Sequence, residues 1–249
     1  MDNMDMINDV LPEEEETSTL VLTDENGEDI TFEYLDCIEY EGKEYTNERA
    51  IATQQTGFWM VGQARPEKVG ILWFGTDDAN MVVFTPVYCC ATEVPDCYKE
   101  CYADPVEFSW KSSFWVFNWV ANMIYPKYSM VIEDMRAVQG ALETKFYAQS
   151  KEVEEQALAV IDASPKYAVK MLTELTCNSA EEALAEWRKF GEKIIVKYND
   201  FVVKEEKNGK VQRGKTGLVG KIVRPGYTEE YKRAIVEQTK DKYLIPQAK

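Results

Sequence analysis

Charged and amide side chains gather at the ends of apolar runs between residues 49 and 80. They are Arg49, Arg65, Asp77, Asp78 and Asn80. Loops at the ends of strands on a rigid sheet commonly carry binding and catalytic groups. Taken singly, each of these residues is also an ordinary turn residue or loop cation. We interpret the five together as a candidate wall of a substrate site, and no oxyanion donor is assigned among them.

The chain contains no histidine, which restricts the chemistry that it can perform. A Ser-His-Asp triad and a Cys-His pair are therefore excluded, and no G-x-x-x-x-G-K-[ST] or G-x-G-x-x-G phosphate loop occurs. An N-terminal nucleophile needs neither, because the first side chain attacks while its own α-amine serves as the base. The printed sequence starts with Met1 and Asp2, and Cys37 lies within a predicted strand. We expect no catalytic nucleophile in this chain.

The six cysteines do not form a recognisable metal site. Cys97 and Cys101 have a C-x₃-C spacing, but no second pair lies at a metal-site distance and no histidine could complete a set. Since the start of the sequence lacks the pattern of a secretory signal, free thiols are favoured over disulfides. Zinc is the less favoured alternative, and we expect no metal and no cofactor.

Three apolar, β-branched and aromatic runs must position these candidate residues. They lie within residues 49–65, 69–80 and 81–88, and Pro, Gly, Asp and Asn occupy the segments that separate them. This arrangement predicts an antiparallel meander of three strands. Phe58–Val61 and Ile71–Phe74 are wholly apolar, so we expect both faces of the sheet to be covered, with Trp73 and Phe74 in the core.

The segment beyond residue 108 predicts helices. The first starts near Ser109 or Ser112, is apolar around most of its circumference, and carries a narrow polar stripe with Asn118 and Asn122. Because buried amides are normally satisfied structurally, we favour a scaffold role for these two residues over substrate binding. Further amphipathic helices are predicted from Ser164, from a capping box at Ser179, and from Thr228 to Thr239. A long helix is predicted from Pro126 to about residue 160, with an interruption near Gly140 or Ser150 left open as an alternative.

The net charge of −16 is confined to the start of the chain. Residues 1–48 hold 17 acids and one base, which leaves 44 − 17 = 27 acids and 28 − 1 = 27 bases in the remainder. Such acidity disfavours nucleic acid and anionic membranes as partners. No apolar run reaches the roughly 18 residues of a membrane span, so a cytoplasmic location is expected.

Five longer runs carry a family resemblance. They are Asn47–Ile51, Gln54–Phe58, Leu72–Asn80, Thr85–Cys89 and Phe108–Asn122. From about Tyr45 onward the chain resembles the second half of the bacterial cysteine dipeptidases, the PepD-like branch of the N-terminal-nucleophile hydrolases. The resemblance implies an α+β fold, in which an antiparallel sheet covered by helices forms part of an αββα sandwich. It also implies hydrolysis of dipeptides by a cysteine that lies upstream of the matched region.

Residues 19–45 resemble the first half of the small acidic YrzB-type domains of unknown function, with a hairpin turn predicted at Asn26-Gly27. We therefore expect an acidic segment over 1–45 and the C-terminal portion of a dipeptidase-like domain over 46–249. The isolated chain is expected to be inactive, with a dipeptide as substrate once an N-terminal half completes it, and a homo-oligomer is compatible with these features. The alternative is a non-catalytic interaction or orphan fusion protein that kept only the scaffold.

Overall fold

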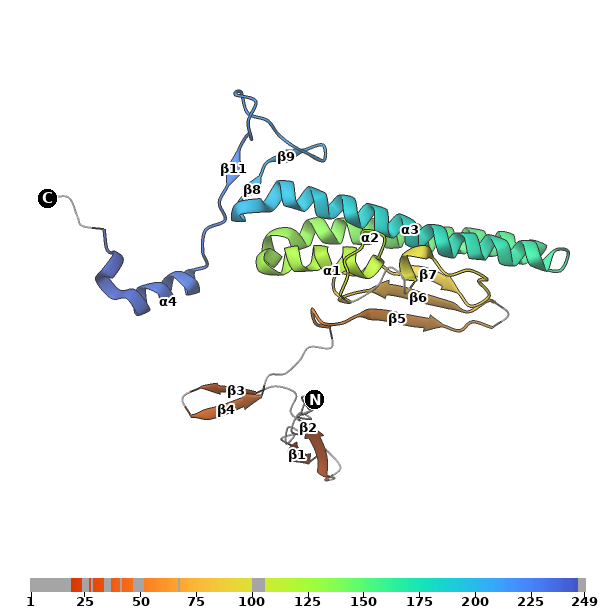
Figure 1. The fold of residues 1–249 in the computed structure, drawn as a ribbon, viewed down its shortest axis with the longest axis horizontal. Coiled ribbons are helices and arrows are strands. Elements are labelled where there is room, and N and C mark those ends of the chain that lie inside the picture. Colours follow the sequence, from red (N-terminus) through yellow and green to blue (C-terminus); the bar gives the residue numbers. More distant parts are fainter. Residues whose placement is uncertain are drawn as a thin grey trace, which may run out of the picture. The chain divides into compact units, whose positions relative to one another are not determined.

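The computed structural model describes residues 19–23, 27, 29–33, 37–40, 42–46, 52–66, 68–99 and 106–245. The chain forms two compact units, Met1–Ile51 and Ala52–Lys249 (Figure 1). Arg49, Asn26 and Cys101 lie outside the described residues.

The first unit contains two β-hairpins. Strand β1 (Thr19–Thr23) pairs antiparallel with β2 (Asp29–Glu33), and β3 (Cys37–Tyr40) pairs antiparallel with β4 (Lys43–Thr46). The two connections contain Gly27 and Gly42, whose φ angles are 84° and 69°. This left-handed region is readily accessible to glycine, so both residues suit tight connections. The hairpin predicted around Gly27 is confirmed, and Cys37 lies in a strand as predicted.

The second unit is built on a sheet of three antiparallel strands. These are β5 (Phe58–Gln63), β6 (Ile71–Thr76) and β7 (Thr85–Tyr88), in the order β5-β6-β7. Trp73 pairs with Val61 on one side and with Pro86 on the other. The predicted meander is confirmed, and β6 is its central strand.

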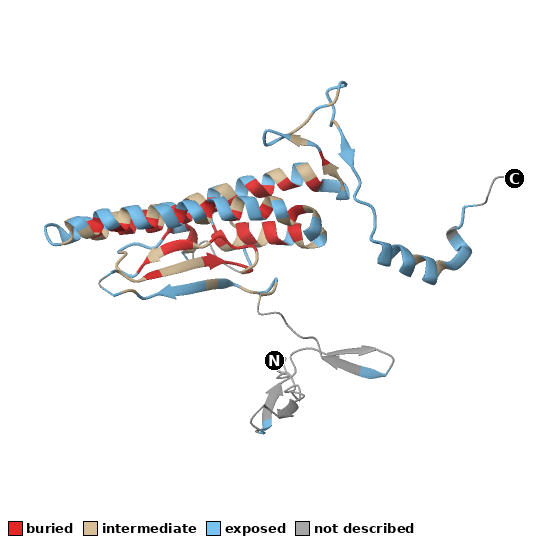
Figure 2. Cartoon of the chain, turned by 180° about the vertical axis from the view of Figure 1, so that it is seen from behind, coloured by how far each residue is buried: buried red, intermediate tan, exposed pale blue. Residues whose placement is uncertain are grey.

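The expectation that both faces of this sheet are covered is wrong for β5. Phe58 is 57% exposed and Met60 is 59% exposed, and Figure 2 shows this strand mostly in the colour of exposed residues. Trp73 and Phe74 on β6 are half-buried, not fully buried as predicted. The reason is that β5 is an edge strand, and a stretch of consecutive apolar residues does not reveal which side a neighbouring element will cover.

Helices cover the rest of the sheet. The α-helices are α1 (Ser113–Ile124), α2 (Tyr128–Val160), α3 (Pro165–Tyr198) and α4 (Glu229–Thr239), with short 3₁₀ turns at Asp96–Tyr98, Tyr125–Lys127, Asn199–Phe201 and Lys240–Tyr243. Helices α2 and α3 run side by side and both contact β7 (Figure 1). Small strands β8 (Val203–Lys204), β9 (Glu206–Lys207), β10 (Lys210–Val211) and β11 (Ile222–Val223) follow. The mixed α+β class predicted from the sequence is confirmed.

The helix start predicted at Ser179 is wrong, and the interruption of α2 left open in the sequence does not occur. Helix α2 continues through Gly140 and Ser150, and α3 continues through Ser179, where a capping box suggested a new start. Ser179 is only 2% exposed and lies on the buried face of α3. Local capping signals are weak compared with the burial of a continuous apolar face, so tertiary packing keeps both helices intact.

The core lies between α1, α2 and α3. Trp187 of α3 is completely buried and stacks on Phe117 of α1, with ring centroids 4.9 Å apart and an interplanar angle of 9°. Gly191 of α3 allows α1 to pack closely, because a Cβ at this position would lie 2.3 Å from the Trp119 ring of α1. A smaller apolar cluster joins Ile71 and Tyr88 of the sheet to Ala157 of α2 and Leu172 of α3.

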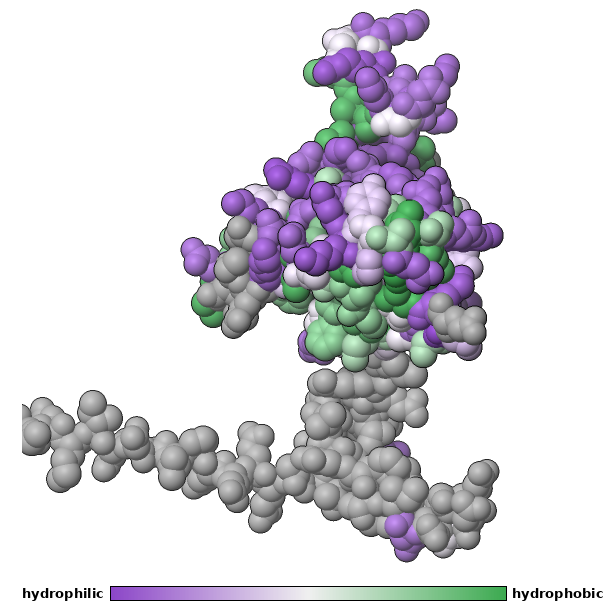
Figure 3. Space-filling view, turned by 90° about the vertical axis from the view of Figure 1, so that its right-hand side faces the viewer, coloured by the Kyte–Doolittle hydropathy of each residue, from purple (hydrophilic) through white to green (hydrophobic). Residues whose placement is uncertain are grey.

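The surface of this unit is mixed in polarity. Figure 3 shows hydrophilic atoms over much of the visible face and patches of hydrophobic atoms exposed beside them. Among the described residues, no helix combines the length and the apolarity that a membrane crossing would require.

Candidate functional site

A buried acidic turn follows the C-terminal end of β6. Asp77 and Asp78 are 2% and 1% exposed, and the Asp77 N–H donates a hydrogen bond to the Gly57 carbonyl oxygen at 2.8 Å. The φ angle of Asp77 is 73°, in the left-handed region that Asp and Asn tolerate better than most other non-glycine residues, as is usual in turns.

Side chains from α1 and the turn after it hold the two carboxylates. Asn118 Nδ2 donates to Asp77 Oδ1 at 2.9 Å, and Tyr125 Oη donates to Asp78 Oδ2. The Asn80 N–H donates to Asp78 Oδ1 at 3.0 Å, which closes the turn on itself. We call Asp77, Asp78, Asn80, Asn118 and Tyr125 the Asp77 cluster.

Helix α2 supports the outer side of the Asp77 cluster. Asn80 Nδ2 donates to Tyr128 Oη at 3.0 Å, and Arg136 Nη2 donates to Asn80 Oδ1. Arg136 Nη1 also donates to Gln139 Oε1 at 2.9 Å, and Gln139 Nε2 donates to the Val82 carbonyl oxygen at 2.6 Å. The turn is thus anchored to two helices, which fixes the positions of its polar groups.

Burial shifts the pKa values of two groups in the cluster. Burial raises the pKa of Asp77 to about 6, although the hydrogen bonds from Asn118 and from the Asp78 N–H lower it in part. Burial and the hydrogen bond to Asp78 raise the pKa of Tyr125. A carboxyl group with a pKa near the working pH can both accept and release a proton, which is what general acid–base catalysis requires.

The raised pKa of Asp77 predicts a specific pH dependence of stability. Between pH 3.8 and about 6 the folded chain binds more protons at Asp77 than the unfolded chain does, so the free energy of unfolding falls as the pH rises through this window. The loss amounts to about 3 kcal/mol, at roughly 1.4 kcal/mol per pKa unit. Asp77→Asn keeps the acceptor for Asn118 and should therefore stabilise the chain by about 1–3 kcal/mol at about pH 8.

Urea unfolding of the wild type and the Asp77→Asn variant at about pH 4 and about pH 8 measures this difference. Asp162→Asn is the matched control, because Asp162 is an exposed aspartate in the connection between α2 and α3. The predicted gain at Asp77 should appear at about pH 8 and shrink at about pH 4. An equal change at the two pH values would contradict the assignment of a raised pKa.

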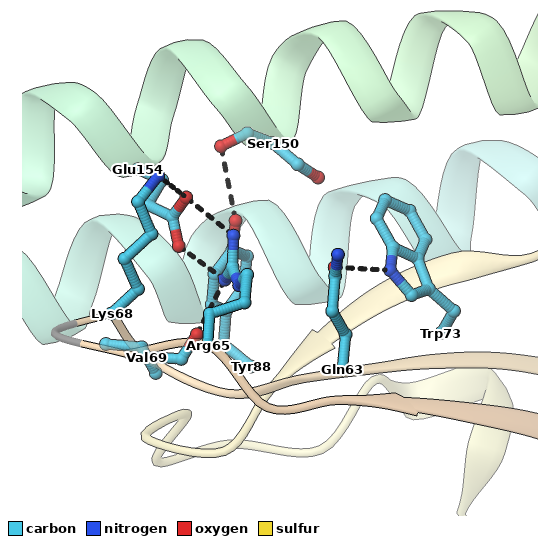
Figure 4. Close-up of polar contacts among 8 residues, drawn as sticks. All are labelled: Gln63, Arg65, Lys68, Val69, Trp73, Tyr88, Ser150 and Glu154. Atoms are coloured by element: carbon cyan, nitrogen blue, oxygen red, sulfur yellow. Dashed lines mark hydrogen bonds and ion pairs between the residues drawn. The ribbon is translucent and has the colours of Figure 1, made fainter.

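Arg65 lies at the opposite end of β6 and has different partners. Its Nη1 donates to Glu154 Oε2 at 2.9 Å, and its Nη2 donates to Glu154 Oε1 at 2.5 Å and to the Val69 carbonyl oxygen at 2.6 Å (Figure 4). Lys68 Nζ lies 3.5 Å from Glu154 Oε2. The six residues of β6 separate this ion pair from Asp77 by roughly 20 Å. The structure brings Asp77, Asp78 and Asn80 together, but not Arg65.

The Arg65–Glu154 pair fastens the loop between β5 and β6 to α2. Glu154→Ala should lower the free energy of unfolding by about 2 kcal/mol, because it removes the carboxylate partner of the largely buried Arg65 guanidinium and leaves only the Val69 carbonyl oxygen as its acceptor. Thermal or urea unfolding measures the loss. Glu155 is an exposed neighbour on the same helix, and Glu155→Ala should change the free energy of unfolding by less than about 0.5 kcal/mol. Similar losses in the two variants would contradict the role of the Arg65–Glu154 pair in attaching the loop to α2.

Several residues that belong to the Asp77 cluster or support it were not among the candidates from the sequence. Asn118 was assigned to the scaffold, and Asn122 Nδ2 indeed donates to its carbonyl oxygen at 2.9 Å, but the Asn118 side chain donates to Asp77. Tyr125, Tyr128 and Arg136 gave no local signal, because their partners lie 47 to 56 residues away in the sequence. Only the polar stripe on α1 pointed toward any of these contacts.

The described thiols do not resemble an activated nucleophile. Cys89, Cys90, Cys97 and Cys177 are all free, and burial raises the pKa of Cys90, Cys97 and Cys177. A raised pKa reduces the thiolate fraction, whereas a nucleophilic cysteine needs it increased. Within the described part of the chain, no group of three or more acidic or cysteine side chains is arranged to hold a metal ion.

Comparison with known families places the Asp77 cluster inside a matched region. Residues 25–141 match the sequence model of Peptidase family C69. The match supports a cysteine dipeptidase-family domain in this part of the chain and a peptidase function in general. No curated protein matches the chain. Because the matched range begins within the acidic segment, the YrzB-type resemblance and the division at residue 45 stay predictions.

Proposed function

We propose that this chain carries part of the active site of a cytoplasmic cysteine-type dipeptidase, which hydrolyses dipeptide amide bonds in peptide catabolism. One observation carries the proposal: every residue of the Asp77 cluster lies within residues 25–141, the range that matches the peptidase family. A buried carboxyl group with a raised pKa, held by specific donors, is a candidate for catalysis on physical grounds.

In this proposal the Asp77 carboxyl group either accepts and releases a proton during hydrolysis or binds the ammonium group of the substrate. Asn118 donates to Oδ1 of Asp77, and the Asp78 N–H also donates to the Asp77 carboxyl group. Asp78 is a positioning residue, because its carboxylate is occupied by the Asn80 N–H and by Tyr125. A turn anchored in this way presents Asp77 in one orientation, and preorganised groups of this kind lower the barrier to reaction.

The nucleophile is proposed to come from a separate N-terminal half that begins with a cysteine. The chain has no histidine, and burial raises the pKa of three of its four described thiols, which argues against a nucleophile among them. A terminal cysteine uses its own α-amine as the base and needs no histidine. The two halves would then contribute different parts of one site.

The test is a dipeptide hydrolysis assay on the chain mixed with such an N-terminal half. In the active mixture, Asp77→Asn should lower kcat by at least about 100-fold, while Asp162→Asn should retain full activity. The pH profile of the residual activity should lose a transition near pH 6. Full activity of the Asp77→Asn variant would overturn the proposed role of Asp77.

A second candidate function is that of a non-catalytic interaction protein. The exposure of Phe58, Met60 and Val61 on β5 favours it, because an edge strand with exposed apolar side chains can pair with another chain. A peptide partner, or a second copy of this chain, would fit such an edge. Binding through β5 without turnover in the presence of any N-terminal half would support this candidate over the dipeptidase.

A further inference from the structure

A shallow cavity between the sheet and α2, widely open to solvent, has no role in the proposed dipeptidase function. Its volume is about 490 Å³, and its lining is mostly apolar. The chief contributors are Val61, Trp73, Phe84 and Tyr147, with Glu143 as the charged member. Small-ligand sites likewise combine an apolar lining with a few polar groups.

Aromatic rings form much of the cavity wall. Trp73 and Tyr147 are stacked, with their ring centroids 6.2 Å apart and an interplanar angle of 26°. The indole Nε1 of Trp73 donates to Gln63 Oε1 at 3.2 Å, which helps to fix the orientation of the ring (Figure 4). Tyr147 is 66% exposed, so ligands can reach it from solvent. The faces of such rings attract cations.

Glu143 places a carboxylate beside these rings. It is half-buried, and its Oε1 accepts a hydrogen bond from the Phe84 N–H at 3.2 Å. Among the described residues it forms no salt bridge. Burial raises its pKa, although the Phe84 N–H and the charge of Arg136 partly oppose the rise. A cation bound next to Glu143 would offset this desolvation.

A neighbouring cavity contains a buried carboxylate that is already paired with cations. It has a volume of about 320 Å³ and shares Trp73 and Tyr147 with the first. Its buried carboxylate, Glu154, is already neutralised by Arg65 and Lys68. Of the two shielded carboxylates, Glu143 is therefore the one that forms no ion pair among the described residues, and for this reason we select the larger cavity as the site for a cation.

We propose that the cavity beside Glu143 binds an organic ammonium cation with a short apolar stem. The ammonium group would lie next to the Glu143 carboxylate and against the rings of Trp73 and Tyr147, and the stem would contact Phe84 and Val61. Charge neutralisation and cation–π attraction act together at such a site. A free alkylamine, a quaternary amine and a lysine side chain of a peptide share this chemistry.

The probes are choline and its neutral isostere 3,3-dimethylbutan-1-ol, titrated into the full chain. The indole N–H resonance of Trp73, assigned by its disappearance in Trp73→Phe, reports binding. Choline should shift this resonance in a saturable manner and bind at least about tenfold more tightly than the alcohol. Titrations with n-butylammonium and with N-acetyl-lysine amide distinguish a free amine from a peptide-borne lysine.

Variants test whether choline binding depends on the Glu143 carboxylate and not on exposed apolar surface in general or on the Asp77 cluster. Glu143→Gln keeps an acceptor for the Phe84 N–H but removes the charge, and it should weaken choline binding about tenfold. Glu133→Gln, at an exposed position on the same helix, and Asp77→Asn should leave choline binding unchanged. Equal affinity for choline and the alcohol, or unchanged binding in Glu143→Gln, would overturn the proposal whatever the outcome of the hydrolysis assay.

Discussion

Dipeptide hydrolysis is expected only when a polypeptide with an N-terminal cysteine is added to the purified chain. The proposed reaction needs a nucleophile whose own α-amine serves as the base, and this chain has no histidine that could substitute. Groups that act as one catalytic unit do not partly replace each other, so the chain alone should be slower on the order of 10⁴-fold or more. Steady-state assays with and without the second polypeptide measure the difference.

The control is the same N-terminal half with its first residue changed from cysteine to alanine. It should bind the chain but restore no turnover, and iodoacetamide should abolish the activity of the intact mixture. Hydrolysis by the chain alone would overturn the proposal that the nucleophile comes from a separate N-terminal half. If the chain alone hydrolyses dipeptides, and both iodoacetamide and Cys37→Ala remove that activity, the acidic N-terminal segment would be a propeptide and Cys37 the nucleophile.

Truncation of Trp187 is expected to have the largest effect on stability. Trp187→Ala should lower the free energy of unfolding by about 3–5 kcal/mol, because it empties a fully buried site and removes the stacking on Phe117. Trp73→Ala should cost only about 1–2 kcal/mol, since Trp73 is half-buried and stacks on the exposed ring of Tyr147. Urea unfolding of the two variants gives the comparison.

Trp187→Phe provides a matched control for the core site. The Trp187 Nε1 atom is buried and has no hydrogen-bond partner among the described residues, so loss of the indole N–H removes no hydrogen bond. Most of the ring volume stays, and the variant should therefore lose much less stability than Trp187→Ala. Equal losses at Trp73 and Trp187 would contradict the placement of the core between the helices.

The local elements were largely predictable from the sequence. Alternation of apolar runs with turn residues predicted β5, β6 and β7 in the right order, and apolar periodicity predicted α1 and the helical C-terminal half. The continuity of α2 and α3 was not predictable, because Gly140 and Ser179 resemble break signals when only neighbouring residues are considered. The exposure of β5 depends on what packs against it, which no local pattern records.

The sequence by itself determined which chemistry was excluded and which residues could form a site wall. The absence of histidine ruled out the common triads, and the turn after β6 was recognised as a candidate from its residue types alone. The tertiary structure decided how those candidates group. It joined Asp77 to Asn118, 41 residues away, and paired Arg65 with Glu154 at the other end of β6. It also raised the pKa of Asp77 through burial, since the energy of a charge depends on its solvation, and solvation is set by long-range packing.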